Sequence, residues 1–196
     1  MHELTDPAPK LEPFFIEYSS IYLHGDILPK DADVPPEVLC LHGGGAEGRS
    51  SFLLLRHVLL QKYLISSCAF DFLGYGGTSG ASGLVEQYQQ EHLNQTTDIV
   101  DACFDSQPFS IVASDISAGV ALQLAESFPV RQLVLLNPPN DQDVTGDTPC
   151  QSVAMPIEAA QTLAYMNSHP AVLLKIAQLV KDTLHGNSRY VRCNYP

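Results

Sequence analysis

One short stretch, Ala113-Ser114-Asp115-Ile116-Ser117, carries a carboxylic acid between two hydroxyl groups. The residues that lead into it, Phe109–Ala113, are short, apolar and β-branched, which predicts a buried strand. The residues that follow have apolar side chains at helical spacing. A chain that turns directly from strand to helix exposes one side chain above the sheet and leaves backbone N–H groups unpaired at the helix start. A nucleophile held at such a turn is therefore the first chemistry to consider.

Two registers of this turn are open. The strand end and the helix periodicity favour Asp115 as the exposed residue, with Ala113 and Ser117 on either side. The other register exposes Ser117 and keeps one neighbouring glycine, Gly119, but makes the strand two residues longer. A carboxylate at this place can attack an alkyl carbon, and water activated by a histidine then hydrolyses the resulting ester. An aspartate there is also an ordinary helix N-cap.

Two glycine-rich stretches each follow a predicted strand. His42-Gly43-Gly44-Gly45 follows the strand Glu37–Leu41 and precedes a helix that runs to about Tyr63, with Ser50 or Ser51 as its cap. Asp71-Phe72-Leu73-Gly74-Tyr75-Gly76-Gly77-Thr78 follows the strand Leu64–Phe72. Glycines allow close backbone approach, and Asp71 suits backbone amides, so we expect Asp71 to be structural.

The three stretches, in this order, resemble the α/β-hydrolase family across roughly residues 14–139. The resemblance implies a nucleophile elbow at Asp115, or at Ser117 in the second register. It implies an oxyanion hole formed by the N–H groups of Gly44 or Gly45 and Ile116, beside His42 and Gly43 as binding-loop residues. Within the family, an aspartate resembles epoxide hydrolases and haloalkane dehalogenases, whereas serine marks esterases. The chain has no tryptophan, which counts against a dehalogenase.

The same resemblance orders the remaining catalytic groups as nucleophile, acid and histidine. Asp143, or its neighbours Asp141 and Asp147, and then His185 satisfy this order. His185 also suits a simpler role, as a cationic residue at a helix C-terminus.

The remaining elements predict an α/β fold with a mostly parallel sheet flanked by helices. We expect one or two edge strands in Phe14–Leu28, broken at Gly25-Asp26, a helix over 85–104 and a strand over Gln132–Leu136. Two helices, Pro156–Asn167 and Pro170–Leu184, follow the last clear strand, so the fold is shortened at its C-terminus. We treat 1–196 as one domain, with a leader over 1–13 and a cap-like helical region over 139–185.

Composition limits the class of partner. The chain has 196 residues, 45% of them hydrophobic, and a net charge of −12, which disfavours nucleic acid and anionic membranes as partners. The five cysteines are widely spaced and no signal peptide is evident, so we expect a cytoplasmic protein with reduced thiols. No metal or cofactor pattern is present, and we expect neither. A small-molecule substrate is the expected partner, and the two apolar C-terminal helices could also form a homodimer.

Two functions stay open. The first is a hydrolase of a small ester or epoxide that works through a covalent intermediate at the elbow. The second is a catalytically degenerate or truncated family member that serves as a binding or interaction module.

Overall fold

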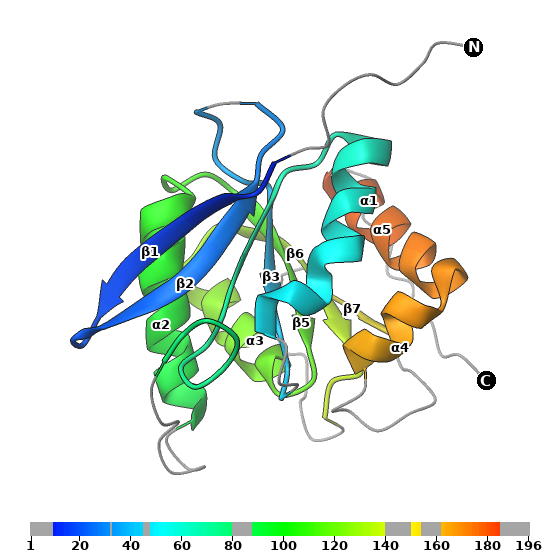
Figure 1. The fold of residues 1–196 in the computed structure, drawn as a ribbon. Coiled ribbons are helices and arrows are strands. Elements are labelled where there is room, and N and C mark those ends of the chain that lie inside the picture. The colour runs from blue at the N-terminus through cyan, green and yellow to red at the C-terminus, as the bar shows by residue number, and fades with distance from the viewer. Residues whose placement is uncertain are drawn as a thin grey trace.

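The computed structural model describes residues 10–31, 33–44, 48–79, 88–139, 150–153 and 162–184. These residues form a seven-stranded sheet with helices on both faces (Figure 1). The strands are β1 (Glu12–Tyr18), β2 (Ile21–Leu28), β3 (Val38–Leu41), β4 (Ser67–Phe70), β5 (Phe109–Ser114), β6 (Val130–Leu136) and β7 (Cys150–Val153). The helices are the 3-10 turn η1 (Gly48–Phe52) and the α-helices α1 (Leu53–Tyr63), α2 (Tyr88–Cys103), α3 (Ser117–Ser127), α4 (Thr162–Ser168) and α5 (Pro170–Leu184).

The sheet has the order β1-β2-β4-β3-β5-β6-β7. The five strands from β4 to β7 in this order are parallel, and the β1–β2 hairpin joins β4 in the antiparallel direction. Strands β3 and β5 are central neighbours, with Leu41 opposite Ala113. Because the two strands are parallel, this pairing brings the chain segments that leave β3 and β5 together at the carboxyl ends of the strands. The predicted α/β fold with a mostly parallel sheet is confirmed.

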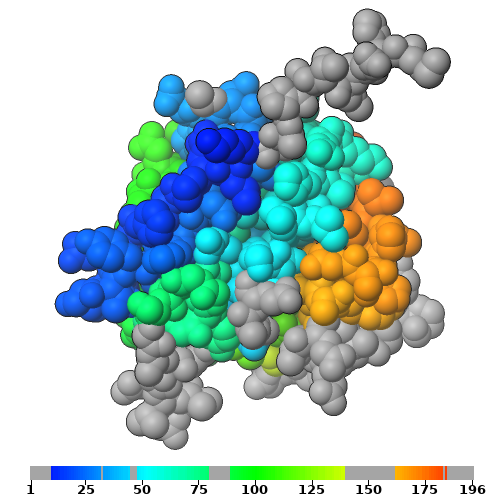
Figure 2. Space-filling view, viewed as in Figure 1, coloured from blue at the N-terminus to red at the C-terminus, as the bar shows by residue number. Residues whose placement is uncertain are grey.

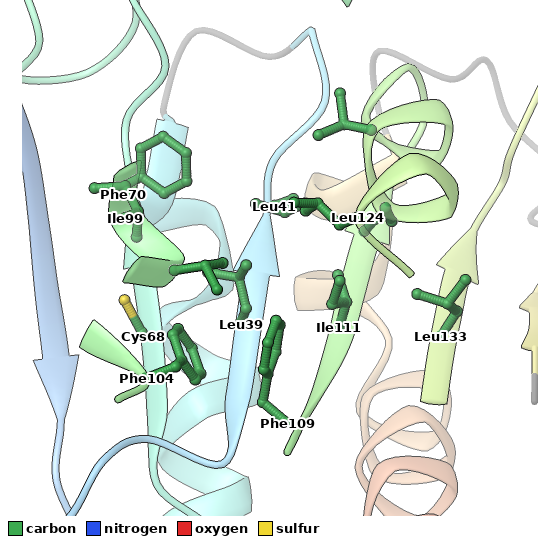
Figure 3. Packing of buried hydrophobic residues seen from close by; sticks show 14 of the residues in the cluster. Leu39, Leu41, Cys68, Phe70, Ile99, Phe104, Phe109, Ile111, Leu124 and Leu133 are labelled. Atoms are coloured by element: carbon green, nitrogen blue, oxygen red, sulfur yellow. The ribbon is translucent and has the colours of Figure 1, made fainter. Parts of the chain in front are cut away.

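The core has two layers because the side chains of each central strand alternate between the two faces. Ile111 of β5 points into a cluster formed with α2 and α3, as does Leu39 of β3 (Figure 3). Val112, the residue after Ile111 in β5, points into a second cluster formed with α1 and α5. Figure 2 shows α1 and the α4–α5 region meeting on one face of the molecule. The sheet is therefore covered on both faces, as a parallel sheet requires.

The N-terminal hairpin turns at a different place from the one predicted. We expected a break at Gly25-Asp26, but both residues lie inside β2, and the turn is at Ser19 and Ser20, with φ of 44° and 71°. Gly25 is needed within the strand because it faces Phe14 of β1, whose ring leaves no room for a Cβ. Asp26 tolerates burial because arginine side chains bind it.

Two predictions on the first crossover helix are also corrected. Neither Ser50 nor Ser51 caps α1, because η1 runs directly into the helix and Phe52 stands at its N-cap without a side-chain hydrogen bond. The following strand is shorter than predicted, since Leu64 ends α1 in the left-handed conformation, with φ of 56°.

The C-terminal part contains a strand that the sequence analysis missed. Strand β7 pairs in parallel with β6, from Leu133 opposite Cys150 to Leu136 opposite Val153. Helix α5 has the predicted bounds, and α4 is described over Thr162–Ser168, whereas residues 156–161 of the helix predicted there lie outside the described residues. The leader predicted over 1–13 is too long, because Glu12 and Pro13 belong to β1; residues 1–9 lie outside the described residues. The loop around Asp143 and the chain from His185 onward also lie outside them.

Candidate active site at the strand-to-helix turn

The turn between β5 and α3 consists of Asp115 and Ile116 alone. Asp115 has φ of 55°, in the left-handed region that non-glycine residues rarely adopt. Its N–H donates to the carbonyl of Leu136 in β6 at 3.0 Å, and its carbonyl accepts the N–H of Ala118 at 3.1 Å. These bonds hold the strained residue at the carboxyl end of β5. The register centred on Asp115 therefore matches the observed turn.

The carboxyl group of Asp115 is held by two hydroxyl groups. Ser114 Oγ donates to Oδ2 at 2.6 Å, and Thr162 Oγ1, at the start of α4, donates to Oδ1 at 2.7 Å. The side chain does not cap α3, because Ile116 occupies the N-cap and the helix start has no side-chain hydrogen bond. The N-cap interpretation of Asp115 is therefore wrong.

Burial dominates the electrostatics of this aspartate. Only 4% of Asp115 is exposed, and the loss of solvent raises the pKa of its carboxyl group above the usual 3.8. The hydrogen bonds from Ser114 and Thr162 act in the opposite direction, because they stabilise the ionised form and lower the pKa. The two hydroxyls thus offset part of the burial penalty of the charge.

Ser117 has a different place from Asp115. It is the first residue of α3, is fully buried, and donates its hydroxyl proton to the carbonyl oxygen of His42. This bond fastens the helix start to the glycine-rich loop that follows β3. The Ser117 hydroxyl is therefore buried and already hydrogen-bonded within the protein.

The glycine-rich loop lies against the elbow. Gly43 faces the Asp115 carboxyl group so closely that a Cβ at Gly43 would stand 2.2 Å from Oδ2. Gly44 is exposed and has open space where a side chain would be, and Ile116 is 42% exposed. Among the described residues, neither the Gly44 N–H nor the Ile116 N–H has a hydrogen-bond partner. Gly45 lies outside the described residues.

The His42 side chain is part of the interior. The N–H of Phe72 donates to His42 Nε2 at 3.1 Å, so that nitrogen is an acceptor and the ring proton lies on Nδ1, which faces the Gly43 carbonyl at 2.8 Å. Burial lowers the pKa of His42 to about 4, so the ring is neutral near pH 7. His92 stacks on Phe72 with ring centroids 3.8 Å apart, and burial, followed by the neighbouring His42, lowers its pKa to about 3.

The expected structural role of Asp71 is confirmed. Its carboxylate accepts the N–H of Arg49 at 2.7 Å and the N–H of Gly77 at 2.8 Å, and it pairs with the Arg49 guanidinium. Gly48 and Gly76 pack against the same carboxylate. Asp71 therefore organises the loop after β4.

Sequence reasoning missed two residues of the site. Thr162 binds Asp115 from 47 residues away, and Asn137, just after β6, donates from Nδ2 to Thr162 Oγ1 at 3.2 Å. Neither residue belongs to a motif, so only their tertiary contacts reveal them. The proposed acid Asp143 and base His185 lie outside the described residues.

The described residues contain no group of three or more His, Cys, Asp or Glu side chains arranged to hold a metal ion. None of their helices has the length and apolar character needed to cross a bilayer.

Several solved structures have a similar fold. A serine hydrolase from the polyaromatic-hydrocarbon-degrading bacterium Cycloclasticus zankles superposes with a TM-score of 0.55 at 20% identity, over 66% of this chain and 46% of its own. The thioesterase domain of the curacin biosynthetic pathway superposes with a TM-score of 0.59 at 16% identity, over 89% of this chain and 65% of its own. A laboratory-evolved variant of a potato epoxide hydrolase superposes with a TM-score of 0.54 at 22% identity, over 65% of this chain and 40% of its own. This chain thus spans less than two thirds of each, and at these identities the likeness shows the fold alone.

No curated protein sequence matches the chain. The model of the "Alpha/beta hydrolase family" matches residues 38–191, which include both glycine-rich loops, the elbow and the two C-terminal helices. This match covers well over half of the sequence. The chain therefore belongs to the alpha/beta hydrolase family.

Proposed function

We propose that this protein hydrolyses a small epoxide through a covalent ester on Asp115. The observation that carries the proposal is the left-handed conformation of Asp115, with φ of 55°, in the two-residue turn between β5 and α3. Backbone strain of this kind costs of the order of 1–3 kcal/mol and persists where the surroundings enforce it. Here it holds the Asp115 carboxylate against Gly43, next in the chain to the exposed residues Gly44 and Ile116.

The reaction has two steps. A carboxylate oxygen of Asp115 attacks an epoxide carbon, the ring C–O bond breaks, and the alkoxide takes a proton from water or a nearby acid. Water then adds to the carbonyl carbon of the ester, and collapse of the tetrahedral intermediate releases a diol and restores the carboxylate. The N–H groups of Gly44 and Ile116 are the proposed donors to the oxyanion of that intermediate, with Gly45 as the alternative loop donor. His185 as the base that activates the water, and Asp143 as its acid partner, remain proposals.

The position of Ser117 favours an epoxide over an ester. Ester hydrolysis through an alkoxide nucleophile would need a free hydroxyl at the turn, and the Ser117 hydroxyl is buried and bonded to the His42 carbonyl. Carboxylate attack on an ester would instead form a mixed anhydride. Carboxylate attack on a strained alkyl C–O bond forms a stable ester, which suits the residue that occupies the turn.

A second function, ligand binding without turnover, is favoured by one observation. Both oxygens of the Asp115 carboxylate already accept a hydroxyl proton, and only 4% of the residue is exposed. A carboxylate so well satisfied is a weaker nucleophile than a free one. In this alternative the elbow is retained as a rigid scaffold of a binding module.

Oxygen labelling tests the first function and separates it from the second. Purified protein in excess over styrene oxide is allowed one turnover in ¹⁸O-water, beside Asp115→Asn and Ser117→Ala. Because water attacks the ester carbonyl, the label is expected in the Asp115 carboxylate and not in the diol, and Asp115→Asn is expected to be inactive at first turnover. Label that enters the diol directly would contradict the ester mechanism. No diol from any form, with retained ligand binding, would favour the binding module.

A further inference from the structure

We propose that Thr162 is a positioning residue that holds the Asp115 carboxylate in the orientation required for attack. The inference deepens the proposed function and rests on it for its catalytic meaning. The geometric part concerns the free protein, so it can be tested without any substrate.

The hydrogen-bond chain fixes the direction of the Thr162 proton. An amide nitrogen is only a donor, so Asn137 Nδ2, at 3.2 Å, requires Thr162 Oγ1 to act as its acceptor. The single hydroxyl proton of Thr162 is then left for Asp115 Oδ1, at 2.7 Å. Thr162 is fully buried, so water does not compete for this proton. The chain from Asn137 to Thr162 to Asp115 is consequently oriented in one direction.

The two hydroxyls hold the carboxylate from different parts of the fold. Ser114 neighbours Asp115 in the chain and binds Oδ2, the oxygen that also faces Gly43. Thr162 comes from the start of α4 and binds Oδ1. With one oxygen held by the elbow itself and the other by a separate helix, rotation of the carboxylate about the Cβ–Cγ bond is restrained. Each oxygen keeps a second lone pair, so the restraint leaves one available for attack.

Thr162 also affects the charge of the nucleophile. Burial raises the pKa of Asp115, and the influences that oppose it are the Ser114 and Thr162 hydroxyls, with no charged side chain of the described residues among them. Without the Thr162 hydroxyl, the pKa is expected to rise further, because a hydrogen bond to the ionised form is lost. The fraction of ionised, attack-competent Asp115 would then fall at mildly acidic pH.

The test uses Thr162→Val and Thr162→Ala, which remove the hydroxyl, and Thr162→Ser, which keeps it. Thr96→Val is the matched control, since Thr96 is also fully buried and its hydroxyl binds a helix carbonyl, that of His92. The pKa of Asp115 is read in the full chain by carbon NMR of labelled aspartate carboxyls, with the signal assigned through Asp115→Asn. Thermal melting shows which variants are folded.

We expect Thr162→Val and Thr162→Ala to raise the Asp115 pKa by about one pH unit, and Thr162→Ser and Thr96→Val to leave it near that of the parent. The acidic limb of kcat/KM for epoxide opening should move by the same amount. An unchanged pKa in folded Thr162→Val or Thr162→Ala would overturn the inference. A shifted pKa with no epoxide turnover by the parent would support the Thr162 contact and refute the hydrolase proposal instead.

Discussion

Gly43 lies against the carboxyl group of Asp115, with no room for a side chain between them: a Cβ on Gly43 would stand 2.2 Å from Oδ2 and 2.9 Å from the Asp115 Cβ. The pairing of β3 with β5 produces this contact, because the two strands end side by side. The glycine-rich loop and the elbow, which are separate motifs in the sequence, are one unit in the structure.

Replacing this glycine should disturb the elbow. Gly43→Ala is expected to lower the free energy of unfolding by about 1–3 kcal/mol, because the added methyl group must displace buried atoms. Gly44→Ala is the control, since a Cβ there meets no atom within 4 Å. Urea unfolding of both variants measures the difference, and equal losses would contradict the contact.

A buried charge network should be sensitive to the loss of Asp26. The fully buried Arg56 pairs with Asp26 and donates to its carbonyl at 3.0 Å, while the more exposed Arg49 binds the same carboxylate at 2.8 Å. Asp26→Ala leaves Arg56 buried without its counter-charge, so we expect a loss of about 3–5 kcal/mol.

Arg49→Met is the comparison for that network. The Arg49 side chain is 26% exposed, and Asp26 keeps Arg56 as a partner in this variant, although Asp71 loses its paired cation. We expect a smaller loss than for Asp26→Ala in denaturant titrations. The reverse order would show that Asp71, rather than Asp26, depends most on these arginines.

Acid should destabilise the fold through its buried histidines. Burial lowers the pKa of His42 from 6.5 to about 4. Between pH 4 and 6.5, His42 is therefore protonated in the unfolded chain and neutral in the folded one. This contribution to stability is complete above pH 6.5 and is lost as the pH falls to 4, at a cost of about 3 kcal/mol. His92, with a pKa of about 3, acts in the same direction. The raised pKa of Asp115 opposes them, since its folded form takes up a proton more readily.

Urea titrations at several pH values measure this effect. His42→Gln removes one titrating group while its amide can still meet the Phe72 N–H and the Gly43 carbonyl. We expect a flatter dependence of stability on pH between 4 and 6.5 in this variant. A slope as steep as that of the parent would show that His42 is not the buried neutral group described above.

Among the three cysteines whose side chains are described, Cys40, Cys68 and Cys103, thiol reactivity should single out Cys103. It is partly exposed, and a hydrogen bond from the Cys68 thiol lowers its pKa, whereas burial raises the pKa of Cys68 and brings that of Cys40 to about 12. The thiolate is the reactive form, so iodoacetamide is expected to modify Cys103 before either buried thiol. Peptide mass spectrometry over time gives the order, and Cys68→Ala should slow the reaction at Cys103. Faster modification of Cys40 would contradict the assignment.

Local pattern was sufficient for the elements that bury a regular face. The apolar run Phe109–Ala113 and the helical spacing after it predicted β5, α3 and the turn at Asp115 between them. The same periodicity gave both ends of α5. Glycine-rich loops at strand ends then indicated the family, because tight turns next to a sheet demand these residues in any sequence context.

Features that depend on a distant partner carried no such signal. The pair Gly25-Asp26 is typical of a turn, yet both residues lie inside β2. Gly25 packs against the Phe14 ring and Asp26 pairs with Arg56, and both partners are distant in the sequence. Strand β7 was missed because Cys150–Val153 has only four residues and is defined by pairing with β6.

Asp115 combines a backbone position set by the local sequence with side-chain contacts set by the tertiary structure. The sequence determined that a carboxylate stands at the strand-to-helix turn, since its neighbours in the chain set the backbone there. Only the tertiary structure decided that this carboxylate turns away from the helix start and binds Thr162, because that hydroxyl reaches it from 47 residues away. Short-range periodicity specifies backbone shape, whereas the partner of a buried polar group is specified by the folding of the whole sheet.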